Sequence, residues 1–347
     1  SLTCICSGPR MASAPPPSAP STARPRPRLW QRLLPWLITA VCFAVLYSRL
    51  AGAARAQGSA LIPYLAASFS GVNWAQWVAL LVPYCLLFTL IDSLVAARVI
   101  SWFNVPVRFS SIFPIRASGY ILSLVNEQVS KGAIALYLSR RHGVPAWEVG
   151  SSMLFLMFCE FYYLLGWATI GVAMERERLP TAFHVIPWIA LAAGAFFVLF
   201  YLFFTGRIAR GSAKEAGLRE RGIFRAFRLA RLRHYAAVLA LRTPLMLAAA
   251  AVYSQSLALF GVQVGYAEML GYLPVIFFGA AVPGPMHSVA ILFWVILFPD
   301  RPGQMTAFGL VQHNFFILFN AAIGVLFLRR ATRELFDASP GTTPPPA

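Results

Sequence analysis

The chain has 347 residues, of which 59% are hydrophobic and only 12% are charged, and its mean hydropathy is +0.66. Because the apolar residues form long unbroken runs, this composition predicts an integral membrane protein and excludes a soluble globular fold. The net charge of +17 does not require a nucleic-acid partner, since basic residues between membrane spans set orientation and contact anionic lipid. We therefore expect membrane lipids as partners, with anionic headgroups at the cytoplasmic face, and no nucleic acid.

The N-terminal segment, residues 1–28, is rich in Pro, Ser, Ala and Arg and cannot bury a hydrophobic core. We predict that it is a disordered tail, and Met11 within it is a candidate start of translation. No small-residue cleavage site follows the tail, so the next apolar segment is interpreted as a retained first span and not as a signal peptide. Residues 331–347 are predicted to form a second disordered tail.

Between the tails we expect one polytopic membrane domain over residues 29–330, with a basic cytoplasmic loop over residues 207–233. Six segments have roughly the 17 to 25 residues that a helix needs to cross a bilayer. They are Leu29–Leu50, Val72–Ala97, Gly150–Ala173, His184–Phe204, Tyr235–Phe260 and Met305–Leu328. Two further apolar segments, Ala117–Leu138 and Ala267–Phe298, are ambiguous.

The distribution of Lys and Arg favours a re-entrant hairpin for Ala117–Leu138. If the N-terminus is cytoplasmic and this segment leaves on the side that it entered, 22 of the 29 basic residues lie on the cytoplasmic side. A full crossing would place the nine basic residues between Arg207 and Arg233 outside, which the positive-inside rule disfavours. The prediction is a multi-pass protein of the plasma (inner) membrane with both termini cytoplasmic.

In Ala267–Phe298 the turn Pro283-Gly284-Pro285 interrupts the apolar run. The arms on either side have about 16 and 13 residues, which at 1.5 Å per residue are too short for a hydrocarbon core of roughly 30 Å. This predicts a second hairpin that dips in from the outside. The expected fold is therefore all-α, with about six full transmembrane helices plus two re-entrant broken hairpins from opposite faces, as an inverted repeat produces around a midplane site.

Polar residues at membrane depth are candidates for that site. Glu160 lies near the middle of Gly150–Ala173, where a charge costs at least ~2.5–3.5 kcal/mol, so a partner is expected. In the functional interpretation Glu160 belongs to a site for a headgroup or a proton. In the structural interpretation it forms a hydrogen bond to a neighbouring helix. Glu127 and Lys131 are four residues apart and can pair on one helix face. Asn126 and Gly132 lie in the same broken segment.

Other polar residues have a functional and a structural interpretation. His287 follows the Pro-Gly-Pro turn and can titrate near neutral pH or serve as a hydrogen-bonding cap. His313 is a candidate to satisfy the broken backbone of the second hairpin. Arg242 and Asp92 lie towards the cytoplasmic ends of their spans, and we predict that both side chains snorkel to the interface.

The loop between Arg207 and Arg233 carries Phe224 and Phe227 among its basic residues. It is either an amphipathic interfacial helix that binds anionic lipid or a stretch of topology-setting charge. The arginines that we expect to contact anionic lipid are Arg140, Arg141, Arg221, Arg225 and Arg228. The sequence contains no HExxH, GxSxG, Walker or cysteine–histidine motif, so we expect no enzymatic activity, no cofactor and no metal.

The segment SLVNEQVSKGAIALYLSRRHGV, followed by SSMLFLMFCEFYYLL, resembles the membrane domain of lysylphosphatidylglycerol synthases and its free-standing, flippase-like relatives, which lack the aminoacyltransferase domain. The positions that match the family are Asn126, Gly132, Arg140, Arg141, Gly143 and Glu160, and later Leu273, Pro274, Gly279, Gly284, His287 and Ser288. Phe161 stands where the family carries Arg, and His287-Ser288 stands where it carries Arg-Glu.

The resemblance implies a translocator of phospholipids or lipid-linked substrates with a polar site between the two hairpins. The residues expected to line that site are Asn126, Glu127, Lys131, Glu160, His287 and His313. The alternative is a non-transporting scaffold or interaction subunit of a cell-envelope lipid or glycolipid pathway. In that case an envelope-biosynthesis enzyme is the expected partner, and the polar groups only satisfy one another.

Overall fold

The computed structural model describes residues 29–56, 58–123, 127–207, 217, 220–281 and 288–336. Within these ranges the secondary structure is helical, with no strand. The elements are α1 (Leu29–Ala56), α2 (Leu61–Ser70), α3 (Trp74–Phe103), α4 (Phe109–Ser123), α5 (Glu127–His142), α6 (Ala146–Met174), η1 (Thr181–Val185), α7 (Ile186–Phe204), η2 (Gly222–Phe224), α9 (Arg225–Leu229), α10 (Leu232–Leu259), α11 (Tyr266–Ala281), α12 (Ser288–Leu297) and α13 (Pro302–Phe336).

Among the described residues, five helical segments are long and apolar enough to cross a membrane: α3, α6, the η1–α7 segment Thr181–Phe204, α10 and α13. Each overlaps one of the six expected spans, so the chain has the all-α class of a multi-pass membrane protein. The expected first span, Leu29–Leu50, lies inside α1, which is not one of these five. α13 continues to Phe336 and so extends into the predicted C-terminal tail.

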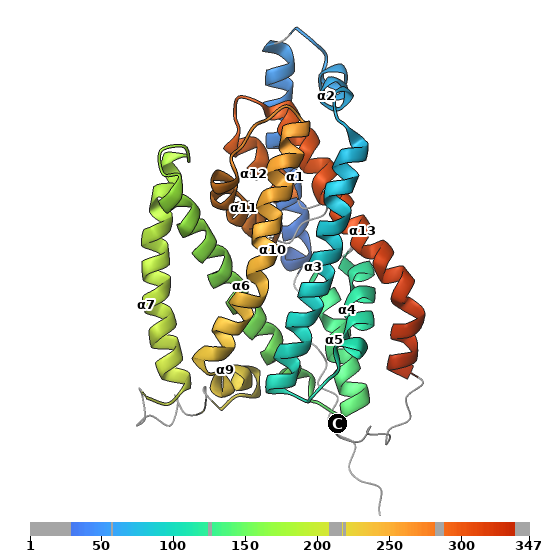
Figure 1. Cartoon of the computed structure of the whole chain (residues 1–347), viewed down its shortest axis with the longest axis vertical. Helices are drawn as coiled ribbons and strands as arrows, with labels where there is room; N and C mark the ends of the chain where they lie inside the picture. Colours follow the sequence, from blue (N-terminus) through green and yellow to red (C-terminus); the bar gives the residue numbers. More distant parts are fainter. Residues whose placement is uncertain are drawn as a thin grey trace, which may run out of the picture.

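The long helices run roughly along the vertical axis of Figure 1, with the short helices placed in two groups. α4 and α5 lie in the lower half of that view, where they pack on each other and α4 lies along α13. α11 and α12 lie in the upper half, where they also pack on each other and α11 contacts α6. Both ambiguous segments of the sequence thus form pairs of short helices.

The first short pair begins earlier than the sequence indicated. α4 starts at Phe109, ahead of the expected start at Ala117. Arg116 directly precedes the expected hairpin Ala117–Leu138 and is one of the 22 basic residues expected on the cytoplasmic side, but it lies inside α4 and is only 8% exposed. The prediction was wrong because the apolar residues Ile112, Phe113 and Ile115 carry the helix inward, and Arg116 finds a countercharge there.

Close helix contacts at glycine hold each short pair to a long helix. A Cβ on Gly171 of α6 would lie 2.3 Å from the backbone nitrogen of Gly271 on α11. A Cβ on Gly324 of α13 would lie 2.5 Å from the carbonyl oxygen of Ala117 on α4. Since helix association in lipid depends on close van der Waals packing, these glycines fix the positions of α11 and α4.

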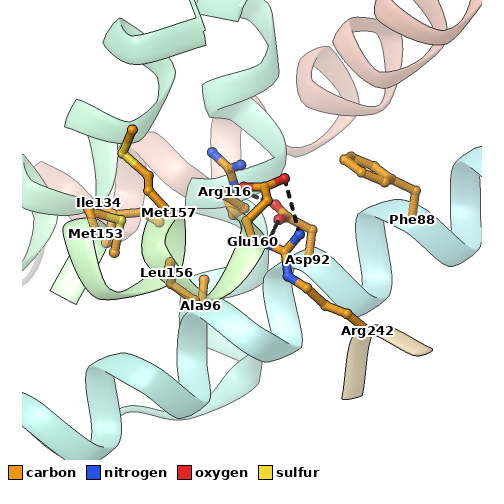
Figure 2. A pocket seen from close by; sticks show the side chains of 10 residues that line it. All are labelled: Phe88, Asp92, Ala96, Arg116, Ile134, Met153, Leu156, Met157, Glu160 and Arg242. Atoms are coloured by element: carbon orange, nitrogen blue, oxygen red, sulfur yellow. Dashed lines mark hydrogen bonds and ion pairs between the residues drawn. The ribbon is translucent and has the colours of Figure 1, made fainter. Parts of the chain in front are cut away.

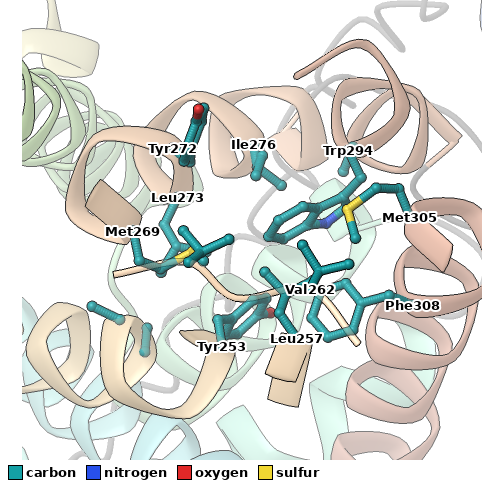
Figure 3. Close-up of a cluster of buried hydrophobic side chains, with 14 of the residues drawn as sticks. Tyr253, Leu257, Val262, Met269, Tyr272, Leu273, Ile276, Trp294, Met305 and Phe308 are labelled. Carbon is teal, nitrogen blue, oxygen red and sulfur yellow. The ribbon is translucent and has the colours of Figure 1, made fainter. Parts of the chain in front are cut away.

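The second short pair is enclosed by protein. Figure 3 shows α11 and α12 packed with α10 and α13 around a buried cluster. Trp294 of α12 is fully buried, and its ring centroid lies 6.1 Å from that of Tyr253 and 5.0 Å from that of Phe308.

The described part of the basic loop does not form an amphipathic interfacial helix, which was one of the two alternatives that the sequence left open. α9 has only five residues, and Phe227 is buried against Phe155, Phe158 and Phe204 instead of facing lipid. The backbone nitrogen of Ala226 donates a hydrogen bond to Ser151 Oγ on α6 at 2.8 Å. The aromatic side chain of this segment therefore fastens the loop to the bundle.

Candidate functional site

Four charged side chains and a tyrosine meet in the interior of the bundle. They come from four helices: Asp92 from α3, Arg116 and Tyr120 from α4, Glu160 from α6 and Arg242 from α10. Figure 2 shows the four charged side chains pointing toward one another. Glu160 is central in the 29-residue helix α6, about 21 Å from either end at 1.5 Å per residue. We call this group of five residues the buried ion network.

Asp92 is the best-satisfied member of the network. Arg116 Nε donates a hydrogen bond to its Oδ2 at 2.6 Å, and the Tyr120 hydroxyl donates to the same oxygen at 2.7 Å. Arg242 Nη2 donates to its Oδ1 at 3.4 Å. The Asp92 and Arg116 side chains are each 10% exposed. Pairing and hydrogen bonding are what a charged group requires when it is buried this deeply.

Arg242 contacts the carboxylates of both Asp92 and Glu160, but not all of its N–H donors have a good hydrogen-bond acceptor. Its Nη1 donates to Glu160 Oε1 at 3.3 Å, and its bond to Asp92 is 3.4 Å long. Both distances exceed the roughly 2.7–2.9 Å of a strong charge-assisted hydrogen bond. Its buried Nε has no hydrogen-bond partner among the described residues. The Arg242 guanidinium therefore keeps capacity for a further acceptor.

Neighbouring polar contacts fix the helices that carry the network. The Tyr163 hydroxyl, one turn after Glu160 on α6, donates to the backbone oxygen of Arg242 at 2.7 Å. The Thr89 hydroxyl, one turn before Asp92 on α3, donates to Asn320 Oδ1 of α13 at 2.6 Å. Residues three apart share a helix face, so these bonds hold α10 and α13 against the same faces that present the two carboxylates.

A cavity of about 60 Å³ adjoins the network. Its walls are formed by the four charged side chains and by Phe88, Ala96, Ile134, Met153, Leu156 and Met157 (Figure 2). A water molecule needs roughly 10–15 Å³ of such space and two to four polar partners. The cavity therefore has the room and the polar wall to hold several water molecules beside the ion pairs.

Glu160 is the accessible member of the network. Its side chain is 43% exposed, against 9% for that of Arg242. Met157 and Phe161, which lie beside it on α6, are 40% and 43% exposed and belong to the outer face of that helix. Glu160 therefore connects the buried charges with the lateral surface of the bundle, on the side that faces lipid.

Glu160 also lies level with the inner ends of both short helix pairs. Phe161 contacts Phe278 of α11 with a ring-centroid distance of 5.7 Å, one turn before α11 ends at Ala281. Met153 of α6 and Ile134 of α5 line the cavity together. α5 begins two turns before Ile134 and runs antiparallel to α6, so its first turn lies at the height of Glu160 (Figure 1).

The structure describes only part of the predicted site. Glu160 has the charged partner that its depth required. His313 is buried on α13, where its Nε2 accepts a hydrogen bond from Trp294 Nε1 at 3.2 Å, and it does not line the cavity. Asn126 and His287 lie outside the described residues, as do Pro283, Gly284 and Pro285.

For Glu127 and Lys131 the structure describes the backbone of α5 but not the side chains, so their pairing stays a prediction. Gly132 lies inside α5, not at a break between helices. A single glycine costs a helix only about 1 kcal/mol relative to alanine, so a helix can continue through it. The role of Gly132 in the backbone of the first hairpin stays a prediction.

Sequence reasoning missed three of the four charged residues. Asp92 and Arg242 were expected to snorkel, but they are 8% and 7% exposed and contact each other. Arg116 was counted as part of a loop. One feature of the sequence could have revealed this pairing. Acidic and basic residues both occur inside apolar segments, and ionisable residues within the membrane usually pair with one another. Pairing between helices removes the need for each side chain to reach water.

Two of the arginines predicted to contact anionic lipid form ion pairs with described glutamates. Arg141 Nη1 lies 2.9 Å from Glu334 Oε2, and Arg225 forms an ion pair with Glu148. Arg140, Arg221 and Arg228 lie at the same end of the bundle, and lipid contact by these five residues stays a prediction. Among the described residues no group of three or more His, Cys, Asp or Glu side chains could hold a metal ion.

Comparisons of the chain with protein-family models, curated proteins and solved structures each found no match. The resemblance to the lysylphosphatidylglycerol synthase membrane domain therefore stays a prediction from the sequence.

The network makes a stability prediction. Asp92→Asn removes the carboxylate that two buried guanidinium groups share, so both arginines lose a countercharge at depth. We expect the free energy of unfolding in detergent to fall by about 3–5 kcal/mol. The matched control is Asp300→Asn in the exposed turn before α13, which should change it by less than about 0.5 kcal/mol. Equal effects of the two substitutions would contradict a charge-dependent network.

Proposed function

We propose that the protein carries phospholipids or lipid-linked substrates across the membrane through the site around Arg242 and Glu160. The observation that carries this proposal is a buried guanidinium at mid-depth with long bonds and an unpartnered Nε, beside a cavity. An unsatisfied buried donor costs about 1–3 kcal/mol or more, and a phosphate oxygen bound there would satisfy it.

The chemistry of the site suits a phosphate-bearing headgroup. Arginine is planar and presents several N–H donors in a fixed fork, which matches two oxygens of a phosphate. Ionisable residues within a membrane are by default functional, and here they adjoin the inner ends of two short helix pairs. Arg242 also provides, from a different helix, the guanidinium that the resembling family carries directly after its glutamate, where this chain has Phe161.

A lateral route from lipid to the site supports the same proposal. Glu160, Met157 and Phe161 are all partly exposed on the outer face of α6. Methionine side chains such as Met153 and Met157 have flexible, unbranched stems that adapt to varied shapes. A headgroup can therefore approach from the bilayer side past these residues while its acyl chains stay in lipid.

The two short helix pairs are, in this proposal, re-entrant hairpins from opposite faces. α4, α5 and α11 have 15, 16 and 16 residues and α12 has 10, so each helix is shorter than the roughly 30 Å core. One pair lies toward each end of the bundle (Figure 1). This arrangement is the one that an inverted repeat produces around a midplane site.

The distribution of arginine supports a cytoplasmic location for the lower end of the bundle in Figure 1. Helix ends and loops there carry Arg98, Arg108, Arg140, Arg141, Arg207, Arg221, Arg225, Arg228, Arg231, Arg233, Arg329, Arg330 and Arg333. The opposite end carries Arg49, Arg55, Arg176, Arg178 and Arg301. We propose that both termini are cytoplasmic and that the membrane is the plasma (inner) membrane.

A scaffold subunit of an envelope lipid or glycolipid pathway is the second candidate. The observation that favours it is charge balance, since the two carboxylates and two guanidinium groups neutralise one another without a ligand. Such a subunit needs the network only for stability. The two candidates differ in whether the purified protein alone moves lipid.

The hairpin proposal predicts the accessibility of introduced thiols. Ser110→Cys, just inside α4, and Ser139→Cys, near the end of α5, should react with a membrane-impermeant maleimide from the same side of oriented vesicles. Thr181→Cys should react from the other side, because α6 crosses between them. Labelling of Ser110→Cys and Ser139→Cys from opposite sides would mean that α4 and α5 together cross the membrane.

The labelling experiment uses a chain in which Cys4, Cys6 and Cys42 are replaced by serine. Cys85 and Cys159 are buried and can stay, since an impermeant reagent does not reach them.

Translocation is predicted for the wild-type protein in phosphatidylcholine vesicles that contain an acyl-labelled phospholipid. We expect transfer between leaflets, measured by extraction of the label with albumin, to be faster than in empty vesicles. Arg242→Lys keeps the charge but loses the fork of donors, so the rate should fall at least about tenfold. Arg98→Gln, an exposed arginine on α3, should leave it unchanged. Wild-type transfer no faster than in empty vesicles would overturn the proposal and leave the scaffold function.

A further inference from the structure

We infer that each anionic headgroup entering the site is accompanied by one proton, which Glu160 binds when the headgroup displaces it from Arg242. The inference rests on the proposed function and names its substrate class, a phosphodiester headgroup of net charge −1. Glu160 then occupies the headgroup position in the resting protein, and the proton is a second substrate.

The starting observation is that the resting network has no net charge. Asp92 and Glu160 contribute two negative charges, and Arg116 and Arg242 contribute two positive charges. A headgroup of charge −1 that bound to this set would leave one uncompensated negative charge at mid-membrane. Uncompensated charge is strongly disfavoured there. Binding of one proton restores neutrality.

Glu160 is the acid that the geometry selects for this proton. Asp92 is held by Arg116 at 2.6 Å and by Tyr120 at 2.7 Å and its side chain is 10% exposed. Among the described residues Glu160 accepts one hydrogen bond, from Arg242 Nη1 at 3.3 Å, and its side chain is 43% exposed. The weaker bond and the open path make Glu160 the group that can leave and meet a proton.

The charged and titratable groups around Glu160 are few among the described residues. α10 presents Arg242 and α3 presents Asp92, while α4 adds Arg116 and Tyr120 on the far side of Asp92. On α6 itself the neighbours are Cys159 and Tyr163.

The helices that flank α6 add no titratable group there, among the side chains that the structure describes. α5 presents Ile134 to the cavity and α11 presents Phe278 beside Phe161. Among the described side chains, Arg242 is the charged group that contacts Glu160, at 3.3 Å, and its transfer to another anion removes that contact.

The exchange balances in atoms and charge. The Glu160 carboxylate takes a proton from a hydronium ion of the aqueous phase and forms one O–H bond, while Arg242 Nη1 donates to a phosphate oxygen the hydrogen bond that Glu160 gives up. No bond in the lipid breaks and no electron is transferred. When the headgroup leaves, Glu160 releases the proton and returns to Arg242. The network is neutral in both states, so the anionic lipid and its proton move together as a neutral pair.

A zwitterionic headgroup behaves differently. Its ammonium group brings the positive charge that compensates its own phosphate, and Glu160 can stay ionised beside that ammonium. Transfer of a zwitterionic lipid then requires no proton. Comparison of the two lipid classes therefore separates proton coupling from a general effect of pH on the protein.

The test uses proteoliposomes of phosphatidylcholine with acyl-labelled phosphatidylglycerol, across which a gradient of one pH unit is imposed. The steady-state distribution of the label between leaflets is measured by albumin extraction. One proton per lipid predicts that wild-type protein enriches the label about tenfold in the leaflet that faces the more alkaline side. Acyl-labelled phosphatidylethanolamine should distribute independently of the gradient. Empty vesicles report any redistribution without protein.

The matched variants are Glu160→Gln and Glu148→Gln, the same substitution on the same helix. Glu148 pairs with Arg225 at the start of α6 and lies outside the cavity. Glu160→Gln should abolish the dependence of the label distribution on pH, and Glu148→Gln should keep it. Circular dichroism and the unfolding midpoint of both variants establish that they fold.

The outcomes separate proton coupling through Glu160 from the translocator function on which it rests. If wild-type protein moves phosphatidylglycerol but distributes it equally between leaflets under the gradient, proton coupling is wrong and the translocator function stands. If Glu160→Gln keeps the wild-type response, the proton is bound elsewhere and the assignment to Glu160 is overturned. If wild-type protein moves neither lipid, the proposed function fails and the inference fails with it.

Discussion

A charged side chain at the middle of a bilayer must find a countercharge, because hydrocarbon offers none. Four such side chains from α3, α4, α6 and α10 meet this requirement by pairing with one another around Asp92. The requirement fixes which faces of these helices point inward, since each charge must reach the others. The neighbouring bonds from Thr89 and Tyr163 hold the same helices in register. The helix arrangement and the chemistry of the site therefore have one origin.

The network is uneven, because its members differ in how tightly they are held and how exposed they are. Asp92 is tightly held and nearly buried, whereas Glu160 is weakly held and open to the outer face of α6. Arg242 lies between them with a donor that has no partner in the described part of the chain. A set of charges whose hydrogen bonds are all made resists rearrangement. A set that contains one weakly bound carboxylate and one guanidinium with an unpartnered N–H donor can exchange a partner. This is the basis for proposing a headgroup site and a linked proton.

The sequence alone predicted the helical class, the two interrupted segments that form short helix pairs, and a partner for Glu160, because hydropathy, segment length and the cost of a buried charge are local properties. It did not predict that Arg116, Asp92 and Arg242 meet Glu160, because pairing between helices depends on the tertiary arrangement. The snorkelling expected for Arg242 followed from its distance to the helix end alone. The position of His313 beside Trp294 was hidden for the same reason. Residues such as Asn126 and His287 lie outside the described part of the chain.

The central claim is that Arg242 exchanges Glu160 for the phosphate of a lipid. A high-resolution structure of the wild-type protein in nanodiscs of phosphatidylglycerol tests this most directly. The account predicts phosphate density within hydrogen-bond distance of Arg242, with the Glu160 carboxylate moved away and Asp92 still bound by Arg116 and Tyr120. An intact ion pair between Arg242 and Glu160, with only water in the cavity beside it, would contradict the account.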